Sequence, residues 1–142
     1  MGRFLFTCAI GTWLGTVVSF SYVFLPTIHA TMEGLPARRL LHRLFPYYYL
    51  TGIGCGLVAL VAVAFAPVSP SLPLGERVRL AVPVAFALLC TLGAWQLLLP
   101  HMERIDSQAA PEKYARVHRF GAMLNTTVLA ALILVMAAVT TR

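Results

Sequence analysis

The stretch LAVPVAFALLCTLGAWQLLL, residues 80–99, decides the fold of this chain. It contains no charged residue, and as an α-helix it is long enough to cross a bilayer core about 30 Å thick. Three further stretches, around residues 4–28, 47–66 and 118–140, are similarly apolar. Because a backbone in lipid must satisfy its own hydrogen bonds, all four are predicted to be transmembrane helices.

The composition favours a membrane protein over a soluble one. Of the 142 residues, 59% are hydrophobic and 11% are charged, and the mean hydropathy is +0.80. A soluble domain carries about 25% charged residues, so this chain lacks the polar surface that water requires. The net charge is +6, but the basic residues lie between the apolar stretches, where they suit anionic lipid headgroups. We therefore expect one transmembrane domain, residues 1–142, in a lipid bilayer, and no binding of nucleic acid.

The connections between the predicted helices are of two kinds. Residues 67–75, PVSPSLPLG, form a break rich in proline, glycine and serine. Residues 35–44, LPARRLLHRL, place leucines and basic residues at helical spacing, which predicts a short amphipathic helix in the membrane interface. Pro46 then turns the chain into the second span, beside an aromatic belt at residues 47–49. The predicted fold class is all-α: an integral membrane four-helix bundle with an interfacial helix between the first two spans.

Basic residues are distributed unequally between the two membrane faces. The connections after the first and third spans carry Arg38, Arg39, Arg43, Arg104, Lys113, Arg116 and Arg119. The opposite face carries Arg3, Arg77, Arg79 and Arg142. Cytoplasmic loops carry an excess of Lys and Arg. We therefore expect the first set in the cytoplasm and both termini outside it, in a bacterial inner membrane.

Small residues recur at steps of four along two of the spans. They are Gly11, Gly15 and Ser19 in the first span, and Gly52 and Gly56 in the second. Small side chains let membrane helices approach closely, because lipid provides no hydrophobic drive for helix association. These faces are predicted to point into the bundle. A unit this small has little interior room, so we expect a homo-oligomer or a membrane protein partner for any transport path.

Three polar side chains within the spans are candidate site residues. Tyr22 continues the stripe of small residues in the first span, Gln96 lies near the end of the third, and Asn125 lies in the fourth. An amide that faces lipid is costly, so Gln96 and Asn125 are predicted to face protein or a wet cavity. No acidic residue lies inside a span, which argues against a transporter driven by carboxylate protonation.

All four histidines are predicted at one membrane face. His29 closes the first span, His42 lies in the next connection, His101 follows the third span, and His118 opens the fourth. One interpretation is that they are interfacial residues at helix ends. The other is a haem or metal site with His29, His101 and His118 as cofactor ligands and His42 as a further metal ligand, since imidazole binds iron, copper and zinc alike. No pair has the spacing of a helical metal motif, so the fold must supply the geometry.

Three short segments carry a resemblance to a known family. The WLG segment at residues 13–15 with Pro26, the LFPYYY segment at 44–49, and the YARVH segment at 114–118 with Asn125 resemble the transmembrane-protein-205-like family, also called domain of unknown function 4149. The resemblance implies a small four-helix membrane protein without an established molecular activity, whose eukaryotic members are associated with drug resistance and secretion. A fainter similarity runs to copper-resistance D-like membrane proteins and to four-helix protoporphyrinogen oxidases, which bind haem. This chain lacks the early histidine expected in the first helix of those oxidases.

Three functions are consistent with these features. The leading hypothesis is a non-enzymatic membrane protein that binds or moves a small ligand, or scaffolds a partner, through a polar cluster at one end of the bundle. An alternative is a haem- or copper-linked redox protein that uses the histidines; without that role, no cofactor is expected. A third is an accessory subunit of a larger membrane complex. The sequence contains no GxSxG motif and no glycine-rich phosphate loop, so no catalytic residue is predicted.

Overall fold

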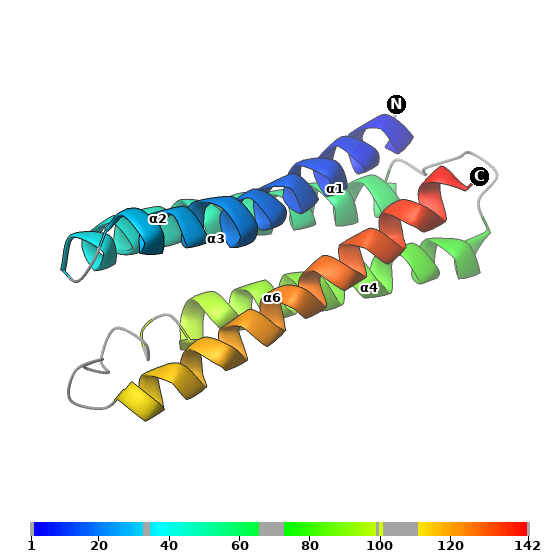
Figure 1. Ribbon diagram of the computed structural model, residues 1–142. Helices are drawn as coiled ribbons and strands as arrows, with labels where there is room; N and C mark the ends of the chain where they lie inside the picture. Colours follow the sequence, from blue (N-terminus) through cyan, green and yellow to red (C-terminus); the bar gives the residue numbers. More distant parts are fainter. Residues whose placement is uncertain (1, 33–34, 66–72, 99, 101–110, 142) are drawn as a thin grey trace.

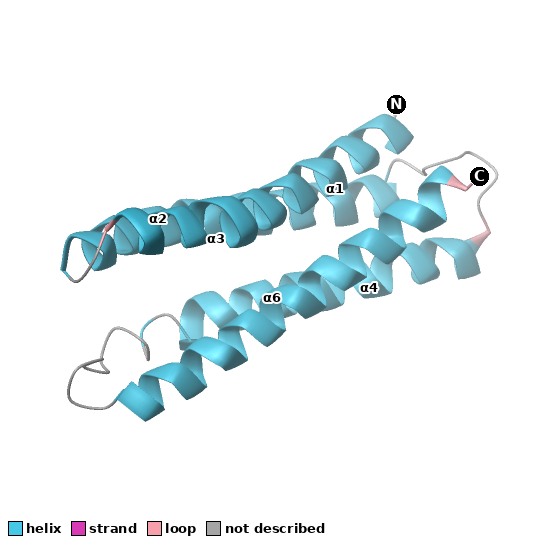
Figure 2. Ribbon diagram, viewed as in Figure 1, coloured by secondary structure: helices cyan, strands magenta, loops and turns pink. Residues whose placement is uncertain are grey.

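The computed structural model of the chain describes residues 2–32, 35–65, 73–98, 100 and 111–141. Every element in these residues is helical, and no strand occurs among them (Figure 2). The described residues include helices long and apolar enough to cross a membrane four times: Gly2–Thr31, Arg39–Phe65, Leu74–Leu97 and Arg116–Thr140, the first to fourth spans. The predicted four-helix membrane bundle is confirmed.

The first span is one continuous helix in which a π-helical turn joins two α-helical parts. α1 covers Gly2–Val18, the π-helical segment η1 covers Ser19–Phe24, and α2 covers Leu25–Thr31. Pro26 stands at the start of α2, where it has no N–H to donate and its ring crowds the carbonyl one turn back. A wider turn before the proline relieves this crowding, and the Leu25 N–H accordingly reaches back five residues to the Phe20 carbonyl. The helix extends beyond the predicted residues 4–28 at both ends.

The second span is part of a longer helix than predicted. α3 covers Leu35–Phe65, so residues 35–44 are helical, but they continue through Pro46 into the span. The prediction of a separate interfacial helix that ends before Pro46 is therefore wrong. The proline removes one backbone hydrogen bond, to the carbonyl of His42. The leucines and arginines before it have high helix propensity, so the helix continues.

The third and fourth spans begin earlier than hydropathy indicates. α4 covers Leu74–Gly93, the π-helical segment η2 covers Ala94–Leu98, and α6 covers Pro111–Thr140. Hydropathy placed these helices at residues 80–99 and 118–140, because its signal ends where charges begin. The structure continues α4 back through Arg77 and α6 back through Lys113. Long charged side chains at a helix end can reach water while their stems lie in the interface, so these turns suit the membrane surface.

The four spans form a ring in which each contacts two neighbours (Figure 1). α1 packs against α3 and α6, and α4 packs against the same two helices. Both termini lie at one end of the bundle, where Arg3 Nη2 donates to the Val139 carbonyl at 2.8 Å. α2, η2 and the first turns of α3 and α6 lie at the other end, which we call the connection end.

Large apolar side chains of α1 fill the core. Phe6, Ile10, Trp13 and Val17 follow one another at helical spacing, and each is at most 1% exposed. They form one cluster with buried residues of the other three spans, including Ala59, Val84, Leu132 and Val135. Close packing of such side chains stabilises the bundle through many small dispersion contacts.

Two of the predicted packing glycines lie against Trp13. A Cβ atom added at Gly52 would be 2.8 Å from Trp13 Nε1, and one added at Gly56 would be 2.9 Å from Trp13 Cζ3. Real Cβ atoms do not approach other atoms this closely, so the indole occupies space that only glycine leaves free. The two glycines of α3 therefore form the recess that receives the largest side chain of α1.

Two of the three small residues in the stripe on the first span do not face the bundle. Gly15 is exposed, with no atom within 4 Å of an added Cβ, and Ser19 is exposed as well. Gly11 is half-buried, with Met136 as the neighbour of an added Cβ. The prediction is therefore wrong for Gly15 and Ser19. The opposite face of α1 carries the larger residues, which gain more dispersion contact when buried, and α3 supplies the small residues that close approach requires.

Candidate ligand-binding site

A cavity of about 460 Å³ lies inside the bundle at the connection end. All four spans contribute to its walls: the first from Val17 to His29, the second around Tyr48, the third around Thr91, and the fourth around Asn125. Most of the lining side chains are apolar or aromatic. Sites for small molecules typically have volumes of about 300–1,000 Å³ and apolar walls with a few polar groups, and this cavity fits that description.

The cavity lies where the first and fourth spans diverge. α1 packs against α6, whereas η1 and α2 do not continue this packing to a comparable extent, and Figure 1 shows α2 and the beginning of α6 well apart. Tyr22 and Pro26 on one side, and Ala122 and Thr126 on the other, line the cavity and are exposed. The cavity therefore has an opening in the side of the bundle, at a level that lies within both spans.

Ser21, Tyr48 and Asn125 form a hydrogen-bonded chain in this cavity. The Tyr48 hydroxyl donates to Asn125 Oδ1, and Asn125 Nδ2 donates to Ser21 Oγ. The three side chains come from three different spans, and each is half-buried. A polar group in a membrane helix is costly without a partner, so these bonds satisfy part of the Asn125 amide and tie the three spans together.

An aromatic cluster holds Tyr48 in place. Its ring stacks on Phe20 with centroids 4.5 Å apart and meets Tyr49 edge-on at 5.1 Å. Phe45 lies 5.4 Å from Phe20 and 6.1 Å from Tyr49. Each such pair contributes about 0.5–1.5 kcal/mol beyond the area that it buries. Of the three tyrosines assigned to an aromatic belt, Tyr47 is exposed, whereas the other two line the cavity.

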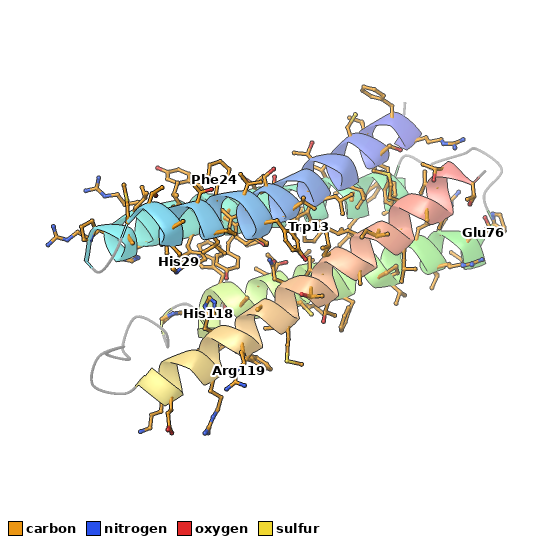
Figure 3. The ribbon with its side chains drawn as sticks, in the orientation of Figure 1. Trp13, Phe24, His29, Glu76, His118 and Arg119 are labelled. Carbon is orange, nitrogen blue, oxygen red and sulfur yellow. The ribbon has the colours of Figure 1, made fainter. Side chains whose placement is uncertain are left out.

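Two of the three histidines in the described part of the chain line the cavity. His29 on α2 and His118 on α6 line it and are exposed, on the sides of the two helix pairs that face each other (Figure 3). The His29 Nδ1–H donates to the Leu25 carbonyl at 2.7 Å, which leaves Nε2 as an acceptor in the neutral ring. His42 is exposed and does not line the cavity, and His101 lies outside the described residues.

The described residues contain no group of three or more His, Cys, Asp or Glu side chains that could hold a metal ion. Of the candidate haem and metal ligands, His29 and His118 line the same cavity. The site predicted from all four histidines stays a prediction.

The two intramembrane amides have different surroundings. Asn125 faces the cavity, but Gln96 in η2 is exposed and does not line it. The prediction that Gln96 faces protein or a cavity is wrong for this chain. Gln96 lies near the end of the third span, where an amide can reach the polar interface, so lipid exposure costs it less than it would cost Asn125.

Sequence reasoning missed Ser21 and the role of Tyr48. The rule that selected Asn125, a polar side chain deep in a span, applies to Ser21 as well. The signal is weak for a hydroxyl, because serine and threonine in helices usually bond to a carbonyl of their own helix and then need no other partner. Tyr48 lies near the start of the second span, where a tyrosine is ordinarily interpreted as an interfacial anchor.

A second hollow, of about 410 Å³, lies on the outside of α1 and α3. Its polar lining includes Thr12 and Thr51, and the Thr51 hydroxyl donates to the carbonyl of Tyr47 in its own helix. The described residues place no chain of polar side chains there. The cavity at the connection end is therefore the better candidate for a binding site.

A comparison with protein families agrees with the resemblance derived from the sequence. The model of a family described as domain of unknown function (DUF4149) matches residues 8–111, well over half of the chain. The matched residues include Ser21, Pro26 and Tyr48, whereas His118 and Asn125 lie beyond them. No curated protein and no solved structure matches the chain. The links to the transmembrane-protein-205-like and copper-resistance D-like proteins stay predictions. On the family match, the chain belongs to the DUF4149 family.

Proposed function

We propose that the protein binds a small lipid-soluble molecule in the cavity between its first and fourth spans. The observation that carries this proposal is the cavity itself, about 460 Å³ with largely apolar walls and one chain of hydrogen-bonding side chains inside it. An apolar ligand body fits such walls, and a few convergent polar groups fix its orientation. This function is binding, and it requires no catalytic residue.

The ligand enters from the bilayer. The opening is bordered by Tyr22 and Pro26 on the first span and by Ala122 and Thr126 on the fourth, all exposed and all within segments apolar enough to span a membrane. A molecule dissolved in lipid can therefore reach Asn125 without crossing an aqueous phase. The apolar surface of such a molecule is already out of water in the bilayer, so its transfer into the apolar cavity gains little hydrophobic free energy. The polar contacts in the cavity therefore decide which molecules bind.

The connection end, and with it the cavity, faces the cytoplasm in our proposal. Among the described residues, that end carries Arg38, Arg39, Arg43, Lys113, Arg116 and Arg119, and the other end carries Arg3, Arg77 and Arg79. This excess favours a cytoplasmic location, and both termini then lie outside the cytoplasm. The cavity accordingly takes its ligand from the cytoplasmic leaflet of a bacterial inner membrane.

Moving the ligand across the membrane requires more than one chain in our proposal. The half of the bundle nearest the termini is filled by buried side chains such as Phe6, Ile10 and Leu132. The cavity therefore ends against packed side chains within one chain. A homo-oligomer or a membrane protein partner supplies the rest of any transport path.

Photolabelling tests the proposed binding. The purified protein in lipid nanodiscs is irradiated with an alkyl diazirine, an apolar probe that inserts into whatever side chains surround it. Adducts are then located by mass spectrometry of peptides. We expect them to concentrate on the cavity-lining residues of segments 17–29 and 118–129, such as Leu25, Ala122 and Leu129, rather than on exposed leucines elsewhere such as Leu89 and Leu134.

Two matched variants make the test specific. Ala122→Trp places a large ring at the opening, so labelling of the cavity residues should fall several-fold. Ala130→Trp is the control, because Ala130 is also exposed on α6 but does not line the cavity. Adducts spread evenly over the lipid-facing surface, or cavity labelling that Ala122→Trp leaves unchanged, would contradict the proposed function.

A further inference from the structure

The polar chain in the cavity has more donor hydrogens than it uses. Tyr48 and Ser21 each offer one O–H, and the Asn125 amide offers two N–H groups, which makes four donors. Two hydrogen bonds join the three side chains, so two donors remain. This number does not depend on the orientation of the amide. If its oxygen and nitrogen were exchanged, the chain would again contain two bonds and keep two donors.

The described residues provide no acceptor for these two hydrogens. Neighbouring hydroxyls behave differently. Thr126 and Thr127, which follow Asn125, each donate to the carbonyl four residues earlier at 2.9 Å, and Thr16 does so in α1 at 2.8 Å. Ser21 lies in η1, where the backbone bonding has shifted, and it accepts from Asn125 without a comparable bond to its own helix.

Unpaired donors are unfavourable in this position, because neither lipid chains nor the apolar walls can accept a hydrogen bond. An alkane would leave both hydrogens unpaired, and a ligand that accepts through a hydroxyl would bring a further hydrogen that itself lacks an acceptor. A carbonyl oxygen has two lone pairs and no hydrogen, so one such oxygen can accept from both remaining donors.

We infer that the ligand is a lipid-soluble carbonyl compound whose C=O oxygen accepts hydrogen bonds from the Ser21–Asn125–Tyr48 chain. This inference rests on the proposed function and names the chemical class of its ligand. The apolar part of the molecule lies along the walls, among side chains such as Phe20 and Leu129. The carbonyl comes either from a free ketone or quinone in the membrane or from the ester of a bilayer lipid, since both present the same acceptor.

A matched pair of probes tests this class. The protein is placed in nanodiscs of ether-linked lipids, which contain no ester carbonyl, and tridecan-2-one and tridecane compete with the alkyl diazirine at equal mole fractions in the bilayer. We expect the ketone to displace the diazirine at a mole fraction about tenfold lower than the alkane, the effect of one or two hydrogen bonds. The infrared C=O band of the bound ketone should shift to lower frequency.

Variants then assign the effect to the polar chain. Asn125→Leu should abolish the advantage of the ketone. Gln96→Leu should retain it, since Gln96 is the other intramembrane amide and does not line the cavity. Ser21→Ala removes one donor with little change in volume, so it should reduce the advantage even where Asn125→Leu fails to fold, as thermal melts would show.

The outcomes separate the inference from the proposed function. If ketone and alkane compete equally, or if the ketone advantage survives in both Asn125→Leu and Ser21→Ala, the inference is overturned and the proposed function stands. If neither molecule displaces the diazirine, the proposed function itself fails. Repeating the experiment in ester-linked lipids identifies the source of the carbonyl. A lost advantage indicates that lipid esters occupy the cavity, whereas a retained advantage indicates a free carbonyl compound, and both support the class.

Discussion

Replacing Gly56 by alanine tests the contact that sets the distance between the first and second spans. The added Cβ would lie 2.9 Å from Trp13 Cζ3 and 3.0 Å from Leu88 Cδ1. Trp13 is 1% exposed, so its indole is enclosed by other side chains. Either the indole or the α3 backbone must therefore shift.

The size of the effect follows from two opposing terms. Overpacking a filled core costs about 1–3 kcal/mol. Alanine in place of glycine stabilises a helix by about 0.5–1 kcal/mol. We therefore expect Gly56→Ala to lower the free energy of unfolding by about 0–2.5 kcal/mol, and by about 1–3 kcal/mol relative to a glycine-to-alanine change without the clash. Gly54→Ala is the matched control: it lies two residues away on the same helix with no atom within 4 Å of the added Cβ, so it should be neutral or slightly stabilising.

The assay is unfolding in mixed micelles with increasing sodium dodecyl sulfate, followed by circular dichroism. Trp13→Phe is combined with each glycine variant, because a smaller ring leaves room for the new methyl group. In the Trp13→Phe background, Gly56→Ala should cost less, with a coupling energy of about 0.5–3 kcal/mol. Equal stabilities of Gly56→Ala and Gly54→Ala, or a coupling energy of zero, would refute the assigned contact between Trp13 and Gly56.

Four further predictions concern other parts of the molecule. Gly15→Leu should leave the unfolding free energy within about 0.5 kcal/mol of the parent, since Gly15 is exposed; a larger loss would show that this face packs against a second copy or a partner. Tyr48→Phe should destabilise the bundle by about 1 kcal/mol, because Asn125 Oδ1 loses its donor. Tyr47→Phe is the control and should have no effect, since Tyr47 is exposed; equal effects of the two variants would argue against the Tyr48–Asn125 bond. A reporter fused after Arg142 should be active outside the cytoplasm, and cytoplasmic activity would reverse the proposed orientation. Protein purified without a His tag should contain haem and transition metals in sub-stoichiometric amounts, unchanged in His118→Ala; a stoichiometric metal lost in that variant would support the redox alternative.

The spans were predictable because the bilayer constrains them strongly. An uncharged stretch such as residues 80–99 has few alternatives to a membrane helix. The ends were less predictable, because hydropathy stops at charged residues and helices do not, as Arg77 and Lys113 show. Pro46 was misleading for a related reason: a proline weakens a helix locally, but the residues around it decide whether the helix ends.

The inner faces were harder to predict than the spans. A stripe of small residues indicates that another helix can approach closely. In a contact between two helices, however, the sequence alone does not say which helix supplies the small residues and which supplies the large side chain that packs against them. Here Gly52 and Gly56 of α3 receive Trp13, whereas Gly15 of α1 faces outward. The same difficulty applies to the candidate site. Asn125 was predictable from its depth in a span, but its partners Ser21 and Tyr48 are 104 and 77 residues away along the chain and come together only in the folded bundle.

Pro26 connects the sequence most directly to the cavity. In an unbroken α-helix, the inner face that carries Trp13, Val17 and Phe20 would continue at position 24. Phe24 is instead 52% exposed and lies on the outer side of the first span (Figure 3), whereas the next residue, Leu25, lines the cavity. A shift of about one residue is what a π-helical turn produces, and such turns occur frequently at functional sites. The shift removes a large aromatic side chain from the inner face at the depth where the first and fourth spans diverge. A proline that widens one turn therefore turns a packed interface into a cavity, and it does so within the part of the chain that the DUF4149 family model matches.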